Sequence, residues 1–321
     1  MKLFRKAAQM VLLFLLLIVF VFFLSRLAPG DPLRAYYGQS VERMNPDQRA
    51  AAEEKLGLDE PLFSQFVIWC GNALRGDFGI SFQYKQDVFS VIGARAGNTL
   101  LLCGTAFLAT FALAVPLGIY CAAHEGSMPD RIISRLGAAL SCIPGFFLAM
   151  LLIAVFSVGL GALPSGGAYP VGGAGDLGGR LRHLILPVLA IVLGHFWSYA
   201  YLVRSRVSGE LKKDYVLLLH AKGVRPAGIL YRHCLRNILP TLLSLAALSV
   251  PHLLGGAYIM EKVFSYPGLG ALSFEAAQYH DYNLLLVLCV LTGAVVVLCS
   301  LLAEFLGERA DPTTRGEARH G

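Results

Sequence analysis

Six long apolar runs, separated by polar segments, dominate the residue pattern of this chain of 321 residues. A helix needs about 20 apolar residues to cross the hydrocarbon core of a bilayer, and a spanning backbone must satisfy its own hydrogen bonds. The pattern therefore predicts an all-α polytopic membrane protein with six transmembrane helices. The expected spans are residues 7–25, 99–123, 136–160, 184–203, 238–260 and 284–303.

The first run follows a basic N-terminus and could be mistaken for a signal peptide. Its uncharged stretch is long, and no small-residue cleavage site follows it. We therefore expect residues 1–25 to be retained as an N-terminal transmembrane anchor.

The basic residues between the runs predict the orientation of the chain. Segments rich in Lys and Arg stay on the cytoplasmic side of a membrane. Residues 204–240 alone hold eight of the 27 Lys and Arg, and the other basic flanks contain Arg131, Arg135, Arg309, Arg315 and Arg319. These flanks and both termini should be cytoplasmic, which places residues 26–98, 161–183 and 261–283 on the opposite side.

The long segment 26–98 reads as an extracytoplasmic insert with short helices of its own. Asn45 is a possible helix cap, Pro46 suits a helix start, and Gly57 predicts a break between two helices. Residues 160–179 are dense in Gly and Pro and predict irregular backbone. Within the runs, Pro144 with Gly145 interrupts the third.

Composition supports lipid as the main solvent. The chain is 56% hydrophobic and only 15% charged, and its mean hydropathy is +0.61. A net charge of +6 could suit nucleic acid, but the basic residues lie beside apolar runs, as juxtamembrane charge does. We therefore expect membrane lipid, and no nucleic acid, as a partner.

Motifs for catalysis or for cofactors are absent from the sequence. It contains no GxxxxGK[ST], no GxSxG and no HExxH, so we expect no catalytic residue, no ATP site and no cofactor in this chain. Its seven cysteines form no CxxC, and its histidines are scattered, so no metal site is expected.

Two histidines fall inside expected membrane helices. A polar group in hydrocarbon is costly unless it faces protein or water, so His195 and His252 should point inward, with Tyr199 one turn from His195. They either line a translocation path or form interhelical hydrogen bonds that hold the bundle together. The full set of path candidates is His195, Tyr199, His252, Gly255, Gly256 and Glu261.

The basic insert 204–240 predicts a helix, a break and a second helix along the cytoplasmic face. The first helix is expected over Glu210–Leu219, the break at Gly223 with Pro226, and the second helix over Ile229–Asn237. Leu217, Leu218 and Leu219 would form an exposed apolar patch unless another protein covers them. A basic amphipathic helix lying on the lipid surface is the alternative.

Several motifs in this chain resemble those of the permeases of dipeptide, oligopeptide and nickel ABC importers. The insert resembles their cytoplasmic coupling loop in the run DYVLLLHAKGVRPAGILYRHCLRNILP, residues 214–240. The other matching pieces are RLAPGDP from Arg26, LGLDEPLFSQFVIW from Leu56, LRGDFGIS from Leu74, NTLLL from Asn98, LPSGG from Leu163 and LGGAYIMEKVFSYPGLG from Leu254. Their order spans nearly the whole chain, and the set resembles the subunit type with a long outer insert after the first helix.

This resemblance implies a type I ABC importer permease in the inner or plasma membrane. The implied partners are a second homologous permease in a heterodimer, two cytoplasmic ATPase subunits that carry ATP and Mg²⁺, and an extracytoplasmic solute-binding protein. The implied division is an anchor at 1–25, an outer insert at 26–98, a permease core at 99–306 with its coupling loop at 204–240, and a cytoplasmic tail at 307–321. The implied ATPase-coupling residues are Asp214, Tyr215, Ala221, Lys222, Gly223, Val224, Arg232, His233, Arg236 and Asn237.

Two positions depart from the family pattern. Leu217 to His220 stand where related loops carry polar or small residues, and Asn283 stands where proline is usual. The first departure could change the choice of ATPase partner, and the second could change a helix start.

Other functions remain open on the sequence alone. A stand-alone carrier or channel, or a membrane scaffold without transport, would also be apolar. An ion-driven carrier should have paired acidic residues within its helices, whereas Glu261 and Glu304 fall at helix ends. For the importer, peptides are the leading substrate class, and nickel or a metal chelate is the alternative.

Overall fold

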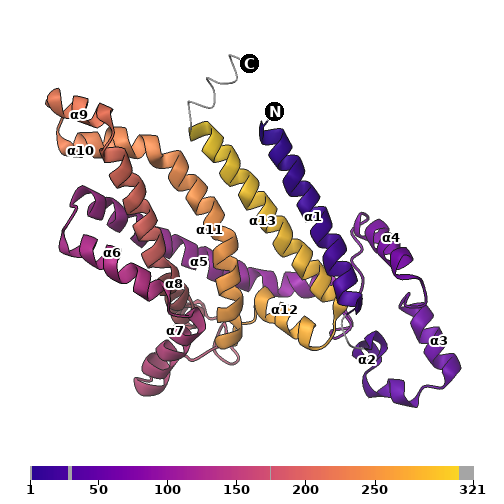
Figure 1. The fold of residues 1–321 in the computed structure, drawn as a ribbon. Helices are drawn as coiled ribbons and strands as arrows, with labels where there is room; N and C mark the ends of the chain where they lie inside the picture. The colour runs from indigo at the N-terminus through magenta and orange to yellow at the C-terminus, as the bar shows by residue number, and fades with distance from the viewer. Residues whose placement is uncertain (1, 28–30, 174, 311–321) are drawn as a thin grey trace. The chain divides into compact units, whose positions relative to one another are not determined.

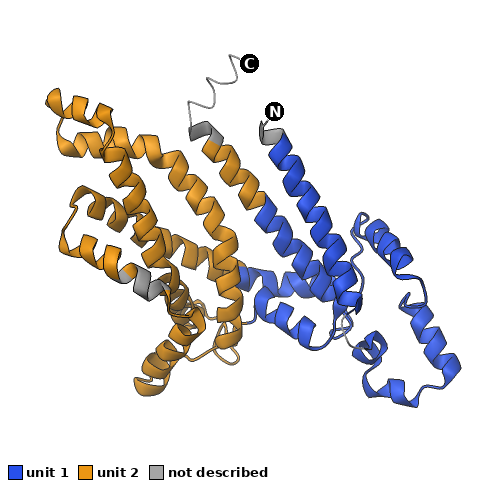
Figure 2. Cartoon of the chain, viewed as in Figure 1, with its two compact units in different colours: residues 1–99, 267–297 blue, residues 100–266, 298–321 orange. Residues whose placement is uncertain are grey.

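A computed structural model of the chain describes residues 2–27, 31–173 and 175–310. The described part is helical, and its one β pairing is an isolated antiparallel bridge between Ile80 and Asp87. The chain divides into two compact units: residues 1–99 with 267–297, and residues 100–266 with 298–321 (Figure 2). Part of the first matching motif, residues 28–30, and residues 311–321 of the expected tail lie outside the described residues.

The first unit holds the N-terminal helix and the short helices of the expected insert (Figure 1). Its elements are α1 (Lys2–Leu27), α2 (Pro32–Tyr37), a 3₁₀ helix (Gly38–Arg43), α3 (Pro46–Lys55), α4 (Leu62–Ala73), α12 (Leu269–Gln278) and the first parts of α5 (Val88–Ala123) and α13 (Tyr282–Ala310). Helix α1 lies against α13, since a Cβ at Gly293 would meet Leu17 Cδ2 at 2.7 Å.

The second unit contains the remaining helices. Its elements are the rest of α5 and α13, α6 (Met128–Ser141), α7 (Gly145–Leu152), a π-helical segment (Ile153–Gly159), α8 (Leu177–Leu211), α9 (Asp214–Ala221), α10 (Pro226–Gly228), a second π-helical segment (Ile229–Cys234) and α11 (Leu235–Val263). Helix α8 packs against α6, α7 and α11.

Among the described residues, five helices are long and apolar enough to cross a membrane. They cover Arg5–Leu27, Val88–Ala123, Leu177–Leu211, Pro226–Val263 and Tyr282–Gly307. Each contains one of the expected spans and extends beyond it. A helix of 36 residues, such as α5, is about 54 Å long, so it reaches well beyond a hydrocarbon core of about 30 Å.

The expected third span, residues 136–160, is not one helix. Helix α6 ends at Ser141, Pro144 caps the next helix, and the apolar stretch that follows covers only Gly145–Gly159. The physical reason is Pro144, which lacks a backbone N–H and pushes the residue before it out of the helical region. The count of six spanning helices stays a prediction.

The short helices of the insert form as the local sequence predicts. The Asn45 side chain accepts from Gln48 N at 2.8 Å, and the Gln48 side chain accepts from Asn45 N at 3.1 Å, which is a capping box. Gly57 then takes φ +64° between α3 and α4. Within the described residues 160–173, 175 and 176, the backbone is irregular, as expected for its Gly and Pro content.

A buried carboxylate fixes the end of the insert to the start of α13. Asp281, which is fully buried, accepts from the Ser81 hydroxyl at 2.5 Å and from the backbone N–H groups of Gln83 and Leu284. Asn283 donates to the Ile80 carbonyl at 3.1 Å. Asn283, the second of the two departures from the resembled pattern, therefore adds a hydrogen bond between these two segments.

Close helix packing organises the second unit. A Cβ at Gly118 of α5 would lie 2.7 Å from the Ala200 carbonyl oxygen of α8, so only glycine allows this approach. One apolar core joins α5, α7, α8 and α11 through Leu102, Ala149, Leu186, Ala190, Leu253 and Ala257. This core holds α8 and α11 side by side, and both helices lead to α9 at one end.

Candidate functional site

Helix α9 is a short, separate helix between two long ones. It starts after Lys213, whose backbone is extended, and ends in a turn at Gly223, whose φ is +77°. Val224 N donates to the Leu219 carbonyl at 3.1 Å and Gly223 N to the His220 carbonyl at 2.9 Å, which is the Schellman pattern. Open space surrounds Gly223, so the backbone conformation alone requires glycine there.

The boundaries of this segment differ from the sequence prediction. The expected helix Glu210–Leu219 is split, because α8 runs through Leu211 and the chain turns at Lys212 and Lys213 before α9 begins. The expected second helix, Ile229–Asn237, is part of one continuous apolar helix over Pro226–Val263. The short separate helix of this segment is therefore α9 itself, attached directly to two long helices.

One face of α9 is buried and the other is open. Val216 packs with Ile229 and Cys234 in a small apolar cluster, and Leu219 and Val224 lie against it. Leu217 and Leu218 are 74% and 55% exposed. The expectation that all three leucines would be exposed is therefore wrong for Leu219, because the helical period turns that side chain toward the cluster.

A buried carboxylate next to α9 was not among the residues selected from the sequence. Glu210, at the end of α8, is 6% exposed. Its Oε1 accepts from the Tyr215 hydroxyl at 2.9 Å and from Asn237 Nδ2 at 3.2 Å, and its Oε2 lies 2.6 Å from Lys213 Nζ. An acidic residue in the last turn of a helix is unfavourable with respect to the helix dipole, and this was the available sequence signal.

The residues expected to couple to an ATPase lie on α9, its turn and the helix that follows. Those exposed are Asp214, Ala221, Lys222, Gly223, Arg232, Arg236 and Asn237, and those half-buried are Tyr215, Val224 and His233. The structure thus brings most of them to an accessible surface around the turn at Gly223.

An ion pair joins α6 to the same end of α8. Arg204 donates to both carboxylate oxygens of Asp130, which also accepts from Gly126 N at 2.7 Å. The hydrogen bond from Arg204 holds the pKa of Asp130 below its ordinary value, although burial acts in the opposite direction. This pair fixes the loop between α5 and α6 beside α8.

A cavity of about 760 Å³ lies among α8, α11 and the start of α7, and it contains most of the path candidates. His195, Tyr199, His252, Gly255 and Gly256 all line it. The rings of His195 and His252 are 4.9 Å apart between centroids. A Cβ at Gly256 would lie 3.0 Å from His195 Nε2, so glycine makes room for that ring.

Glu261 is not part of this cavity. Its side chain is fully buried near the end of α11, where its carbonyl accepts from Tyr266 N at 2.7 Å. Among the residues that the structure describes, no group of three or more His, Cys, Asp or Glu side chains is arranged to hold a metal ion.

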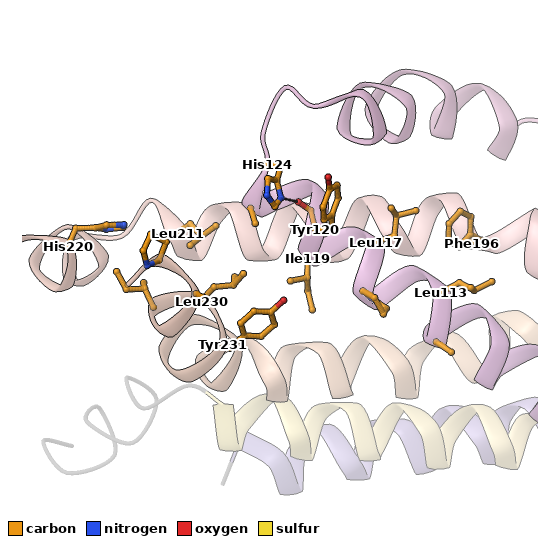
Figure 3. A pocket seen from close by; sticks show the side chains of 16 residues that line it. Leu113, Leu117, Ile119, Tyr120, His124, Phe196, Leu211, His220, Leu230 and Tyr231 are labelled. Atoms are coloured by element: carbon orange, nitrogen blue, oxygen red, sulfur yellow. Dashed lines mark hydrogen bonds between the residues drawn. The ribbon is translucent and has the colours of Figure 1, made fainter. Parts of the chain in front are cut away.

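A second hollow, of about 1080 Å³, lies next to α9 (Figure 3). Its walls come mainly from α5 and the helix that follows α9, and Ile119 and Leu230 belong to one apolar cluster there. His220 of α9 lines its edge, as does His124, whose Nδ1 lies 3.0 Å from the Tyr120 carbonyl oxygen. The hollow therefore reaches from His220 of α9 along the ends of α5 and of the helix that follows α9.

These features define a multi-pass membrane protein with a short, partly exposed helix between two long ones and a cavity lined in part by His195, Tyr199 and His252. The family model described as "Binding-protein-dependent transport system inner membrane component" matches residues 114–316, and the model of its N-terminal region matches residues 1–103. The chain belongs to this family and is therefore a permease subunit of an ABC importer.

Curated relatives match over nearly their full length. A putative peptide permease protein of Brucella ovis is 34% identical over 93% of each chain. The oligopeptide transport system permease protein AppB of Bacillus subtilis is 30% identical, over 96% of this chain and 97% of its own. The glutathione transport system permease protein GsiC of Escherichia coli is 32% identical, over 92% and 93%.

A solved structure confirms the fold class. An inward-facing structure of the MetNI methionine ABC transporter has a chain that aligns with a TM-score of 0.56 and 17% identity, covering 70% of this chain and 97% of that one. At this identity the match concerns the fold alone. The sequence-based assignment to the ABC importer permeases, and to their helical fold, is confirmed.

Proposed function

We propose that this permease carries peptides, including short ones of the glutathione type, across the inner membrane. The observation that carries the proposal is the similarity, at 30% to 34% identity over more than nine tenths of both chains, to relatives named for peptide, oligopeptide and glutathione transport. These names favour peptides over the nickel or metal-chelate alternative.

The chain acts with partners that supply energy and solute. A second, homologous permease completes the pathway, two cytoplasmic ATPase subunits bind and hydrolyse ATP, and an extracytoplasmic binding protein delivers the peptide. This chain contributes no catalytic residue. Membership of the binding-protein-dependent family supports the general composition, since its members work with such components.

Helix α9 docks in a groove of one ATPase subunit. Its exposed Leu217 and Leu218 need an apolar cover, and the exposed Lys222 and Arg225 beside them favour an acidic rim on that groove. The remaining expected coupling residues surround this contact. Closure of the ATPase pair on ATP would then displace α9 and, through it, the membrane helices.

The cavity around His195 and His252 forms part of the path for the peptide. Its polar groups lie between two long apolar helices, where a polar side chain without a hydrogen-bond partner would raise the free energy of the folded protein. Imidazole and tyrosine side chains can exchange hydrogen bonds with the amide groups of a peptide without a fixed charge. Glu261 keeps a structural role outside the cavity.

Both termini and α9 face the cytoplasm in this proposal. Ser244, near the start of α11, donates to the Ala303 carbonyl of α13 at 3.0 Å, which supports a common end for α9 and the C-terminal part of α13. The division into anchor 1–25, insert 26–98, core 99–306 and tail 307–321 follows from this orientation.

Uptake by the reconstituted transporter tests the substrate class. Proteoliposomes that contain both permeases and both ATPases, supplied with the binding protein, should take up a labelled di- or oligopeptide but not Ni²⁺. His195→Ala and His252→Ala should each reduce the rate at equal expression, while His124→Ala, outside the cavity, should not. Nickel uptake without peptide uptake would overturn the substrate assignment, and unchanged rates in both histidine variants would overturn their place in the path.

Substitution at Gly223 tests the coupling role. Gly223→Glu adds an anion to a face expected to meet acidic groups, so it should abolish transport while the protein remains in the membrane. Gly223→Ala strains the same backbone without adding charge and should retain most of the transport. Normal uptake by Gly223→Glu would contradict the docking of α9.

A further inference from the structure

Three helical elements meet at one carboxylate beside the docking helix. Glu210 is in the last turn of α8, Tyr215 is in the first turn of α9, and Asn237 is in the first turn of α11. Tyr215 and Asn237 both donate to the same oxygen, Oε1 of Glu210, at 2.9 and 3.2 Å. The carboxylate therefore ties α9 to both long helices at once.

The setting of this carboxylate makes its hydrogen bonds costly to lose. Glu210 is 6% exposed, and a buried acceptor left without a donor pays its full desolvation penalty. Lys213, which lies 2.6 Å from Oε2, has a side chain that is 60% exposed, so solvent screens its charge. The two neutral donors belong to α9 and α11, so they join Glu210 to both of these helices, whereas Lys213 lies in the turn between α8 and α9.

The Tyr215 hydroxyl is suited to remain a donor. Burial is the main cause that raises its pKa above the ordinary value, and its hydrogen bonds to Cys234 and Glu210 act in the same direction. The hydroxyl also lies 3.4 Å from Cys234 Sγ. At physiological pH it therefore keeps its proton and its bond to Glu210.

The helices joined by Glu210 are those that form the cavity. Helix α8 carries His195 and α11 carries His252, and both residues line the cavity. Apart from this contact, α9 is joined to α8 by the turn at Lys212 and Lys213, and to α11 by the turn after Ala221. A small apolar cluster that includes Leu211 of α8 and Cys234 also packs against α9. Turns bend easily, whereas a buried and fully paired carboxylate resists displacement.

We propose that Glu210 is a positioning residue that makes a displacement of α9 move α8 and α11 together, and so transmits ATPase closure to the walls of the cavity. This inference rests on the proposed function of α9 as the docking helix. In this proposal, Oε1 of Glu210 transmits the movement by accepting hydrogen bonds from both helices. The exposed surface of α9 binds the ATPase subunit.

The test measures peptide imported per ATP hydrolysed by the complete transporter in proteoliposomes. Glu210→Leu keeps much of the volume but removes the acceptor, and should lower this ratio roughly tenfold while ATPase subunits still bind. Glu210→Gln keeps an acceptor oxygen and should restore the ratio to within about twofold of the wild type. Lys213→Ala, the matched control, should also stay within about twofold.

A purely structural role predicts a different result. Glu210→Leu would then lower the amount of assembled transporter but leave the ratio unchanged in the assembled fraction, and this outcome overturns the inference. If Glu210→Leu does not assemble, Tyr215→Phe removes a single donor, and a ratio equal to the wild type in that variant also overturns it. A Glu210→Gln ratio as low as that of Glu210→Leu would show that charge, not the acceptor, matters, and would overturn it too.

Failure of the proposed function is recognised separately. If Gly223→Glu binds the ATPase and transports normally, α9 is not the docking helix, whatever the Glu210 variants do. If Gly223→Glu abolishes transport while the Glu210→Leu ratio is unchanged, only the transmission role of Glu210 fails.

Discussion

The exposed leucine pair of α9 allows a quantitative prediction for ATPase binding. Leu217 and Leu218 are 74% and 55% exposed in the free chain. Truncating a fully buried leucine to alanine loses about 2 kcal/mol of transfer free energy. We multiply this value by the exposed fraction of each side chain, because only that surface can still be buried by a partner. The loss of binding free energy is then about 1.5 kcal/mol for Leu217 and about 1.1 kcal/mol for Leu218.

The double variant Leu217→Ala with Leu218→Ala should therefore weaken docking by about 2.6 kcal/mol, which is roughly an 80-fold increase in Kd. The measurement is a fluorescence titration of the ATPase subunit against the permease pair in nanodiscs. Transport should fall in parallel at ATPase concentrations below the new Kd.

Leu298→Ala is the matched control, because Leu298 on α13 is 65% exposed but lies within a membrane span away from α9. It should leave the Kd within about twofold, since the same truncation there removes no docking surface. A Kd for the double variant within about threefold of the wild type, in correctly folded protein, would refute the reasoning that the leucine pair is covered by the ATPase.

Three further predictions concern the helical frame and the insert. Gly118→Val should destabilise the second unit by about 1–3 kcal/mol, because a side chain there meets the Ala200 carbonyl oxygen at 2.7 Å; an unchanged Tm in detergent would contradict it. Asp281→Ala removes the acceptor of three hydrogen bonds, so protease cleavage between residues 77 and 87 should accelerate roughly tenfold. A cleavage rate equal to that of the wild type would show that Asp281 does not hold this segment in place. Because Arg204 lowers the pKa of Asp130, its carboxylate stabilises the fold above the unfolded-state pKa, and this stability is lost as the pH falls through the lower folded-state pKa. The Tm of Asp130→Asn should therefore fall less on acidification than the Tm of the wild type. An equal fall in Tm for both proteins would show that Asp130 does not link stability to pH.

The short helices of the insert show where the local sequence is sufficient to predict a helix start. Asn45, Pro46 and Gln48 form a cap from neighbouring residues, and the cap forms as predicted. The third span shows both kinds of signal, since the predicted interruption at Pro144 and Gly145 is present, whereas the length of the apolar run overstates the helix.

The segment around α9 was predicted in part. The motif over residues 214–240 predicts a break at Gly223, and the chain does turn there, because the positive φ of this residue is a local requirement. The hydrogen bonds of Glu210 are not predicted by the sequence, since Asn237 is 27 residues away along the chain and only the fold brings it to the carboxylate. The division of the leucines was also missed, because it depends on which face of α9 meets the buried cluster.

The sequence by itself determined the membrane class, most of the spans, the expected sidedness and the family, because apolar run length, basic flanks and ordered motifs are readable along the chain. The tertiary structure alone decided that Leu219 turns inward, that His195 and His252 lie with their ring centroids 4.9 Å apart, and that Glu210 joins three helical elements. These features depend on contacts between residues distant in sequence. Such contacts form only when helix packing brings remote segments together, and no local pattern encodes that arrangement.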